Sequence, residues 1–222
     1  MCGSPIGVKL KMKNDQINSK EIEASTVPPS KLDEMHPGGL TPFLRTPELD
    51  TSRFYMGSLL TFLSTGNDTG GRTSLMIYDG VPGNEPPPHV HEWEHETYYI
   101  LEGIMEFYCD GKVMLARQGE LVFLPEGKAH AFFIRSPQVK LLITLHATSE
   151  HAVGLDRYFL EMSHPAESMS LPENQATYAT DGPERAIAVG EKTGIKILSP
   201  EETADLLPHY PGFGARRELL KD

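Results

Sequence analysis

Short runs in which apolar and polar residues alternate recur through the middle of the chain. Turn residues such as glycine, proline, asparagine and aspartate separate these runs at intervals of about 8–12 residues. These runs have a period of two, and no long helical segment interrupts them. This pattern predicts about eight antiparallel strands that close into an all-β barrel or jelly roll. The runs are Phe54–Leu63, Ser74–Tyr78, Tyr98–Leu101, Ile104–Tyr108, Val113–Ala116, Leu121–Leu124, Ala131–Ile134 and Val139–His146.

One hairpin stands out among these runs. The pair Asp110-Gly111 separates the runs that end at Tyr108 and begin at Val113. Both residues tolerate a positive φ, which two-residue hairpin turns of the favoured type require. We therefore expect these two runs to pair with each other.

The pattern changes after Ser149, where residues 153–162 show the spacing of an amphipathic helix. A second helix is predicted over residues 184–194, with Gly194 at its C-terminal end. Ser199 followed by Pro200 is typical of a helix start, and Pro208 ends that third helix. The C-terminal part is thus expected to pack on the barrel as a helical extension.

These patterns divide the chain into three parts. Residues 1–35 contain several lysines and no sustained hydrophobic period, and are predicted to form a flexible N-terminal arm. An N-terminal strand that pairs with a partner subunit is the alternative for this arm, and Met12 is a candidate natural start, so residues 1–11 need not be native. Residues 36–148 are predicted to form the barrel, and residues 149–222 the helical extension.

Charge and composition exclude several classes of protein. The formal net charge of −11 disfavours a nucleic-acid binder. There is no apolar stretch of the ~18 residues needed to cross a membrane, and no secretory signal. The two cysteines, Cys2 and Cys109, cannot form a disulfide framework, which fits a reducing compartment. We therefore expect a soluble cytoplasmic protein.

Histidines concentrate where two of the predicted strands begin. His89 and His91 stand two residues apart, so a strand would direct both side chains to the same face. Glu96 follows on the next strand, and His130 comes from further along the chain. Three imidazoles and one carboxylate meeting in a barrel form a site for one divalent transition metal, and such a set does not distinguish among Fe, Ni, Co, Mn, Cu and Zn.

The two segments that carry these residues resemble the paired motifs of the cupin superfamily. Residues 83–103 match G-x5-H-x-H-x4-E-x6-G at every spacing, and residues 119–130 match G-x5-P-x-G-x2-H. The second motif usually ends in an asparagine, where this chain has Ile134. The resemblance implies a jelly-roll barrel with a metal held by His89, His91, Glu96 and His130.

Other residues are placed relative to this set. His95 directly precedes Glu96 and is expected on the opposite face, while His146 ends the last strand near the barrel mouth. The remaining histidines are expected on the surface or in the tail. Three residues share faces with the expected ligands and are predicted to line a substrate pocket, with core packing as the alternative: Tyr98, Ile100 and Phe132.

Residues from about 55 to 200 are similar to quercetinase-type monocupins. The similarity rests on residues 56–71, on the prolines at 86–88 before His89, and on residues 157–172. It implies a homodimeric, quercetin 2,3-dioxygenase-like enzyme that opens a flavonol or a similar enolic or aromatic substrate with O2, releasing carbon monoxide and a depside. Glu96 would then be both a metal ligand and the general base, and Phe132 would help to exclude water.

The same site is compatible with other functions, because the fold alone does not fix an activity. A metal acting as a Lewis acid also supports an isomerase, cyclase or lyase that uses no O2. A cupin that binds a small-molecule ligand without turnover is a further alternative. A transcriptional regulator is least favoured, since no helix-turn-helix pattern appears outside the barrel.

Overall fold

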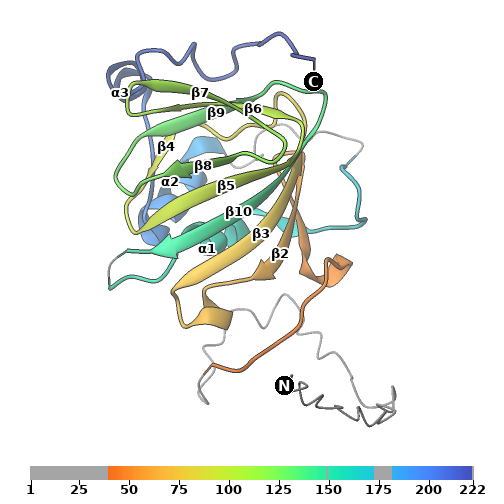
Figure 1. Cartoon of the computed structure of the whole chain (residues 1–222). Helices are drawn as coiled ribbons and strands as arrows, with labels where there is room; N and C mark the ends of the chain where they lie inside the picture. Colours follow the sequence, from red (N-terminus) through yellow and green to blue (C-terminus); the bar gives the residue numbers. More distant parts are fainter. Residues whose placement is uncertain (1–39, 149, 173–181, 222) are drawn as a thin grey trace, which may run out of the picture.

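The computed structural model describes residues 40–148, 150–172 and 182–221 (Figure 1). The predicted arm at residues 1–35 lies outside these residues, as do Cys2 and His36. Twelve strands of the described residues form two antiparallel sheets, in the orders β11-β1-β2-β3-β10-β5-β8 and β12-β4-β9-β6-β7. The predicted all-β jelly-roll architecture is confirmed.

The larger sheet consists of β1 (Ser52–Tyr55), β2 (Ser58–Ser64), β3 (Thr73–Gly80), β5 (Glu94–Glu102), β8 (Leu121–Leu124), β10 (Val139–Ala147) and β11 (His164–Pro165). The smaller sheet consists of β4 (His89–His91), β6 (Ile104–Cys109), β7 (Lys112–Arg117), β9 (His130–Ile134) and β12 (Ile195–Ile197). Two short 3-10 turns, η2 (Leu49–Thr51) and η3 (Asn67–Thr69), flank the first strands.

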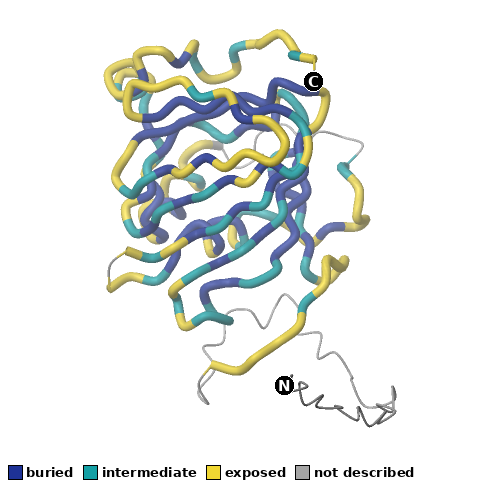
Figure 2. The backbone as a smooth tube through the Cα atoms, in the orientation of Figure 1, coloured by how far each residue is buried: buried dark blue, intermediate teal, exposed yellow. Residues whose placement is uncertain are grey.

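The core lies between the inner faces of the two sheets, where the tube in Figure 2 is mostly dark blue. Side chains alternate between this core and the outer face along β5, since Tyr98 and Ile100 are buried whereas Tyr99 is exposed. Each large apolar side chain buried in this way contributes ~1.5–3 kcal/mol relative to an exposed one. Among the largest are Phe62, Phe107, Ile100, Leu124 and Leu141.

The turns explain one correct and one wrong prediction. Asp110 and Gly111 have φ of 52° and 71° and join β6 to β7, so the predicted hairpin is confirmed. The single strand predicted over Phe54–Leu63 is wrong, because the chain reverses at Met56-Gly57 and forms β1 and β2. Met56 adopts a φ of 49°, which is unusual for a methionine, so the sequence carried only a weak turn signal there.

The three predicted C-terminal helices are present as α1 (Leu155–Met162), α2 (Gly182–Thr193) and α3 (Pro200–Leu206). Gly194 follows α2 with a φ of 71°, and the Ser199 hydroxyl accepts a hydrogen bond from the N–H of Glu202 at the start of α3. None of the helices in the described part of the chain is long and apolar enough to span a membrane.

The C-terminal part also contributes a strand, which the helical prediction missed. β12 lies between α2 and α3 and pairs with β4, so that Ile197 is opposite His89 and Ile195 is opposite His91. Beyond α3, Tyr210 packs on Phe133 and Tyr108 and thereby covers the outer face of β9 and β6. The C-terminal part therefore completes the smaller sheet as well as packing on it.

Candidate metal centre

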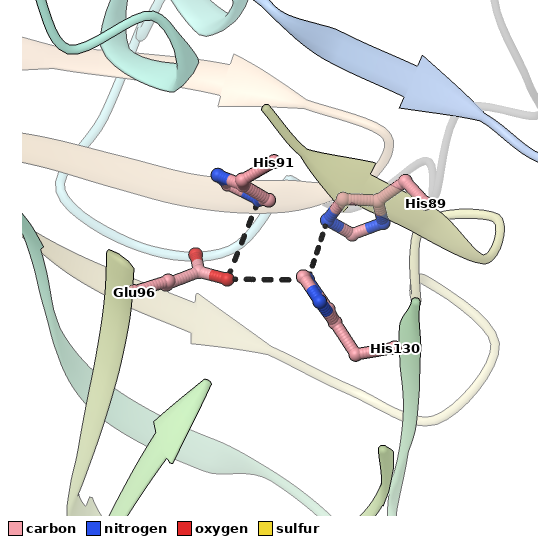
Figure 3. Close-up of side chains that lie close together, drawn as sticks. All are labelled: His89, His91, Glu96 and His130. Atoms are coloured by element: carbon pink, nitrogen blue, oxygen red, sulfur yellow. Dashed lines mark hydrogen bonds and ion pairs between the residues drawn. The ribbon is translucent and has the colours of Figure 1, made fainter. Parts of the chain in front are cut away.

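Three strands of the barrel bring four polar side chains to one point of its interior (Figure 3). β4 presents His89 and His91 on the same side, as a two-residue spacing in a strand requires. β4 pairs with β9 so that His89 is directly opposite His130, and β5 supplies Glu96 from the other sheet. All four residues are buried, with at most 6% of any of them exposed.

The four side chains direct one ligand atom each toward a common centre. The Nε2 atoms of His89 and His130 lie 3.1 Å apart. One carboxylate oxygen of Glu96, Oε2, lies 3.5 Å from Nε2 of His91 and 3.4 Å from Nε2 of His130. The four ligand atoms all lie within 4.8 Å of one another. The structure thus brings together all four residues that the motifs indicate.

Outer hydrogen bonds orient the three imidazole rings. Each ring uses its Nδ1 atom to contact an oxygen outside the cluster, and an oxygen that only accepts requires Nδ1 to be the protonated nitrogen. Each Nε2 then carries a lone pair directed at the centre, which is the form of histidine that binds a metal. The partners are the Pro87 carbonyl for His89 at 2.8 Å, the Glu94 carboxylate for His91 at 2.8 Å and the Lys128 carbonyl for His130 at 3.0 Å.

Buried atoms without a partner indicate that this donor set fits a cation. Within the described residues, Nε2 of His91 and both carboxylate oxygens of Glu96 are buried without a hydrogen-bond partner. Buried polar atoms in native proteins are nearly always satisfied, so three in one cluster call for a ligand. Three imidazole nitrogens and a carboxylate oxygen are donors suited to a divalent transition metal.

Burial and mutual electrostatics set the protonation of the cluster. Burial would raise the pKa of Glu96, but the neighbouring imidazoles of His91 and His130 outweigh it and bring the pKa to about 2. Burial lowers the pKa of His89 well below its usual range, and the other two imidazoles lower it further. Burial also lowers the pKa of His91, yet the carboxylates of Glu96 and Glu94 raise it to a net value above normal. Glu96 is therefore ionised and His89 neutral at physiological pH.

A narrow, largely apolar cavity adjoins the cluster, and His89 belongs to both. The free space inside it is about 30 Å³, enough for one or two water molecules, and its wider outline of about 540 Å³ includes space open to solvent. Tyr98 and Phe132, two residues predicted to contact substrate, line it, whereas the third, Ile100, is fully buried in the barrel core and is not among the lining residues. Helix α1 contributes Tyr158 and Phe159 to its wall.

The remaining histidines of the part of the chain that the structure describes lie outside the cluster, as expected. Nδ1 of His95 accepts a hydrogen bond from the N–H of Glu126 at 2.9 Å, and its ring packs edge-on against Phe123. His146 is exposed at the end of β10. Neither side chain contributes an atom to the centre.

Glu94, the buried partner of His91, was not predicted from the sequence. A usable signal existed, because Glu94 stands two residues before Glu96 and must face the same side of β5. The cavity residues Tyr55 and Tyr158, whose hydroxyls lie 3.3 Å apart, were not predicted either. These residues come from β1 and α1, and only the tertiary fold brings them together.

One protein family matches the part of the chain that contains the cluster. A family model described as a cupin domain matches residues 77–145, the segment that contains all four residues of the cluster. The segment that carries the candidate site therefore matches the cupin family, as its two motifs predict. Among curated cupin relatives, quercetin 2,3-dioxygenase of Bacillus subtilis (strain 168) is 29% identical over 91 residues, which cover 40% of this chain and 27% of that protein.

Two further proteins are similar to parts of this chain. The epoxidase atD of Aspergillus terreus (strain NIH 2624 / FGSC A1156) is 33% identical over 79 residues, 34% of this chain and 25% of that protein. The chain spans about a quarter of the length of these two curated relatives. A solved structure, a predicted oxalate decarboxylase from Thermotoga maritima, has a TM-score of 0.42 and 22% identity, covering 48% of this chain and 100% of that chain.

Proposed function

We propose that this cupin is a metal-dependent dioxygenase that opens a flavonol or a similar enolic or aromatic substrate with O2. The observation that carries the proposal is that His89 belongs both to the four-residue cluster and to the apolar cavity. A substrate in that cavity would contact the metal centre directly. The similarity to a quercetin 2,3-dioxygenase supports this choice of substrate class.

In this proposal, His89, His91, His130 and Glu96 hold one divalent transition metal, which is Fe, Ni, Co, Mn, Cu or Zn. When bound, the metal supplies Lewis acidity that lowers the pKa of a substrate hydroxyl beside it. The three histidines bind through Nε2, because each Nδ1 donates to an outer oxygen.

Glu96 has two oxygens for two roles. Oε2 is the oxygen near the Nε2 atoms of His91 and His130 and is placed to bind the metal. Oε1 is buried without a hydrogen-bond partner among the described residues and is free to accept the proton of the substrate hydroxyl. As a carboxylate oxygen, it can accept the proton of a hydroxyl that the metal has made more acidic.

The cavity wall would orient the substrate and exclude water. The rings of Tyr98 and Phe132 meet edge-to-face with centroids 5.7 Å apart, and each residue is only 3% exposed. We assign both residues to substrate contact. Ile100 lies behind them in the core, so we assign it to packing.

A metal-dependent isomerase, cyclase or lyase that uses no O2 is the second candidate. The observation that favours it is the pair of phenol hydroxyls of Tyr55 and Tyr158 in the cavity wall, 3.3 Å apart. Such hydroxyls can donate a proton to a substrate, a step that ring opening by O2 does not need. Turnover without O2 that chelation abolishes would identify this candidate, and tight binding without turnover would identify a ligand-binding cupin.

We further propose that the chain consists of a barrel at residues 36–148 and an extension at residues 149–222, and that it acts on a small molecule in the cytoplasm. We also propose that it forms a homodimer. Strand β8 ends the larger sheet, and the side chains of Leu121, Phe123 and Tyr99 are exposed on β8 and its neighbour β5. An apolar strand edge of this kind is normally covered. Light scattering of the purified protein tests the dimer, which a monomeric mass would exclude.

The deciding experiment uses metal-analysed protein with quercetin, first without and then with O2, while the visible absorbance of quercetin is followed. We expect bleaching that requires O2, releases carbon monoxide and is lost in Glu96→Gln. Metal without bleaching would exclude quercetin and shift the proposal to another enol or carbonyl substrate. Absence of both, after reconstitution with Fe, Ni, Co and Mn, would refute the proposed enzyme.

A further inference from the structure

Glu94 binds three donors from two different parts of the molecule. Its Oε1 atom accepts hydrogen bonds from Nδ1 of His91 at 2.8 Å and from the N–H of Leu155 at 3.0 Å. Its Oε2 atom accepts from the N–H of Gly154 at 2.6 Å. The side chain is only 1% exposed, so these three donors replace the water that a carboxylate normally requires.

Two of these donors belong to the start of helix α1. Gly154 is the N-cap residue of α1 and has no side chain that could accept from the first N–H groups of the helix. Glu94, on strand β5, takes over this role from outside the helix, and its negative charge faces the positive end of the helix dipole. The same helix supplies Leu155, Tyr158 and Phe159 to the cavity.

We infer that Glu94 is a positioning residue that couples the metal ligand His91 to α1, the wall of the substrate cavity. The part that concerns the metal rests on the proposed function. One rigid carboxylate fixes the Nδ1–H tautomer and the ring orientation of His91 while it holds the first turn of α1 against the barrel. Metal binding at His91 and ordering of the cavity wall therefore reinforce each other.

The chemistry of the three donors explains why a carboxylate is required. A glutamine has nearly the same shape, but one of its two terminal groups is an NH2 donor. With the NH2 at the position of Oε1, it would face the N–H groups of His91 and Leu155. With the NH2 at the position of Oε2, it would face the N–H of Gly154. Either orientation places a donor against a donor in a buried site.

The test compares Glu94→Gln with Asp156→Asn, using Co²⁺ as the probe. Asp156, in the first turn of α1, is a matched control because its buried carboxylate also accepts from two backbone N–H groups. They belong to Gly66 at 2.6 Å and Arg157 at 2.8 Å, and neither is part of the cluster. Titration calorimetry gives the Co²⁺ affinity, and the visible spectrum of bound Co²⁺ reports its coordination. We expect Glu94→Gln to lose about 10–100-fold in affinity with an altered spectrum, and Asp156→Asn to change neither.

Hydrogen exchange tests the coupling to α1 directly. In the unchanged protein, Co²⁺ should slow exchange of the backbone amides of Gly154 and Leu155, and this protection should persist in Asp156→Asn and disappear in Glu94→Gln. A Glu94→Gln variant with normal affinity, spectrum and protection would overturn the inference while leaving the proposed function intact. Failure of the unchanged protein to bind any divalent metal would instead refute the proposed function, and the inference with it.

A second measurement needs no variant and covers the case in which Glu94→Gln does not fold. Nitrogen-15 NMR of the zinc-loaded protein distinguishes the two tautomers of His91. Bonding to Glu94 requires the proton on Nδ1 and the metal on Nε2. The opposite tautomer would overturn the assignment.

Discussion

The indole ring of Trp93 lies directly against Gly194. A Cβ atom added to residue 194 would be 2.3 Å from Cδ2 of the indole, and the N–H of Glu92 donates to the carbonyl of Gly194 at 2.8 Å. On its other side, the Trp93 ring stacks on His151 with centroids 4.4 Å apart. The loop between the metal-site strands β4 and β5 is therefore held in place by the end of helix α2.

Gly194→Ala should destabilise the protein by ~2–5 kcal/mol. Its φ of 71° costs an L-residue ~1–2 kcal/mol, and the contact with a ring that is fixed on its far side adds ~1–3 kcal/mol. Urea unfolding measures the change. The matched control is Gly111→Ala. Gly111 has the same φ of 71°, and no described atom lies within 4 Å of the added Cβ, so this variant should lose only the ~1–2 kcal/mol that comes from the backbone conformation. Equal losses in the two variants would contradict a close contact between Trp93 and Gly194.

His130→Ala should lower the affinity for a divalent metal by more than ~100-fold. The change removes one of four ligand atoms, a larger loss than the ~10–100-fold that follows removal of an outer hydrogen-bond partner. Metal titration with mass-spectrometric metal analysis measures it. His146→Ala, an exposed histidine outside the cluster, should bind metal normally. Stoichiometric metal of unchanged affinity in His130→Ala would require a different ligand set.

Removing the metal should lower the unfolding temperature. A ligand that binds only the folded state stabilises it by ~2.7 kcal/mol at a free concentration of one hundred times Kd, which corresponds to ~5–10 °C for a domain of this size. Thermal unfolding before and after treatment with a chelator, and again after metal is restored, provides the measurement. The His130→Ala variant should show a much smaller difference, and an equal one would place the stabilising metal elsewhere.

Asp156 should make stability depend on pH in a defined direction. Burial raises the pKa of this carboxyl, and the nearby Glu94 raises it further; hydrogen bonds from the N–H groups of Gly66 and Arg157 oppose this, and the result is a pKa of about 6 compared with 3.8 normally. The folded state thus holds the proton more tightly than the unfolded state. Its contribution is complete below pH 3.8 and is lost as the pH rises through 6, with a total on the order of 3 kcal/mol.

The measurement is urea unfolding between pH 4 and pH 7 for the unchanged protein and for Asp156→Asn. Other titrating groups cancel in the difference between the two proteins. The stability of the unchanged protein relative to Asp156→Asn should fall as the pH rises across this range. A difference that stays constant would show that Asp156 is already ionised at the lower pH.

The sequence predicted the parts of this protein that depend on local spacing. His89, His91 and Glu96 could be placed on common faces because a strand has a fixed period of two, and the hairpin at Asp110-Gly111 could be placed because few residues tolerate a positive φ. His130 could be joined to them only through the resemblance to a family. The structure then places it directly opposite His89 in the neighbouring strand.

Other features depend on contacts between distant segments and could not be predicted. Strand β12 has only three residues, too few to show a period, and it becomes a strand because β4 offers it a free edge. Ile100 lies on the same face of β5 as Tyr98, so the alternation along the strand could not show that Tyr98 lines the cavity and Ile100 does not. The turn at Met56-Gly57 was hidden because methionine is a poor turn residue.

The position of β12 has a consequence for how the protein is made. Strand β4, which carries two of the four cluster residues, lies between β9 and β12, a strand that comes about 100 residues later in the sequence. Pairing between segments so far apart in sequence forms late in folding, since the loop between them must close first. During synthesis, residues up to Ile197 must therefore leave the ribosome before β4, which carries His89 and His91, can be paired along both of its edges.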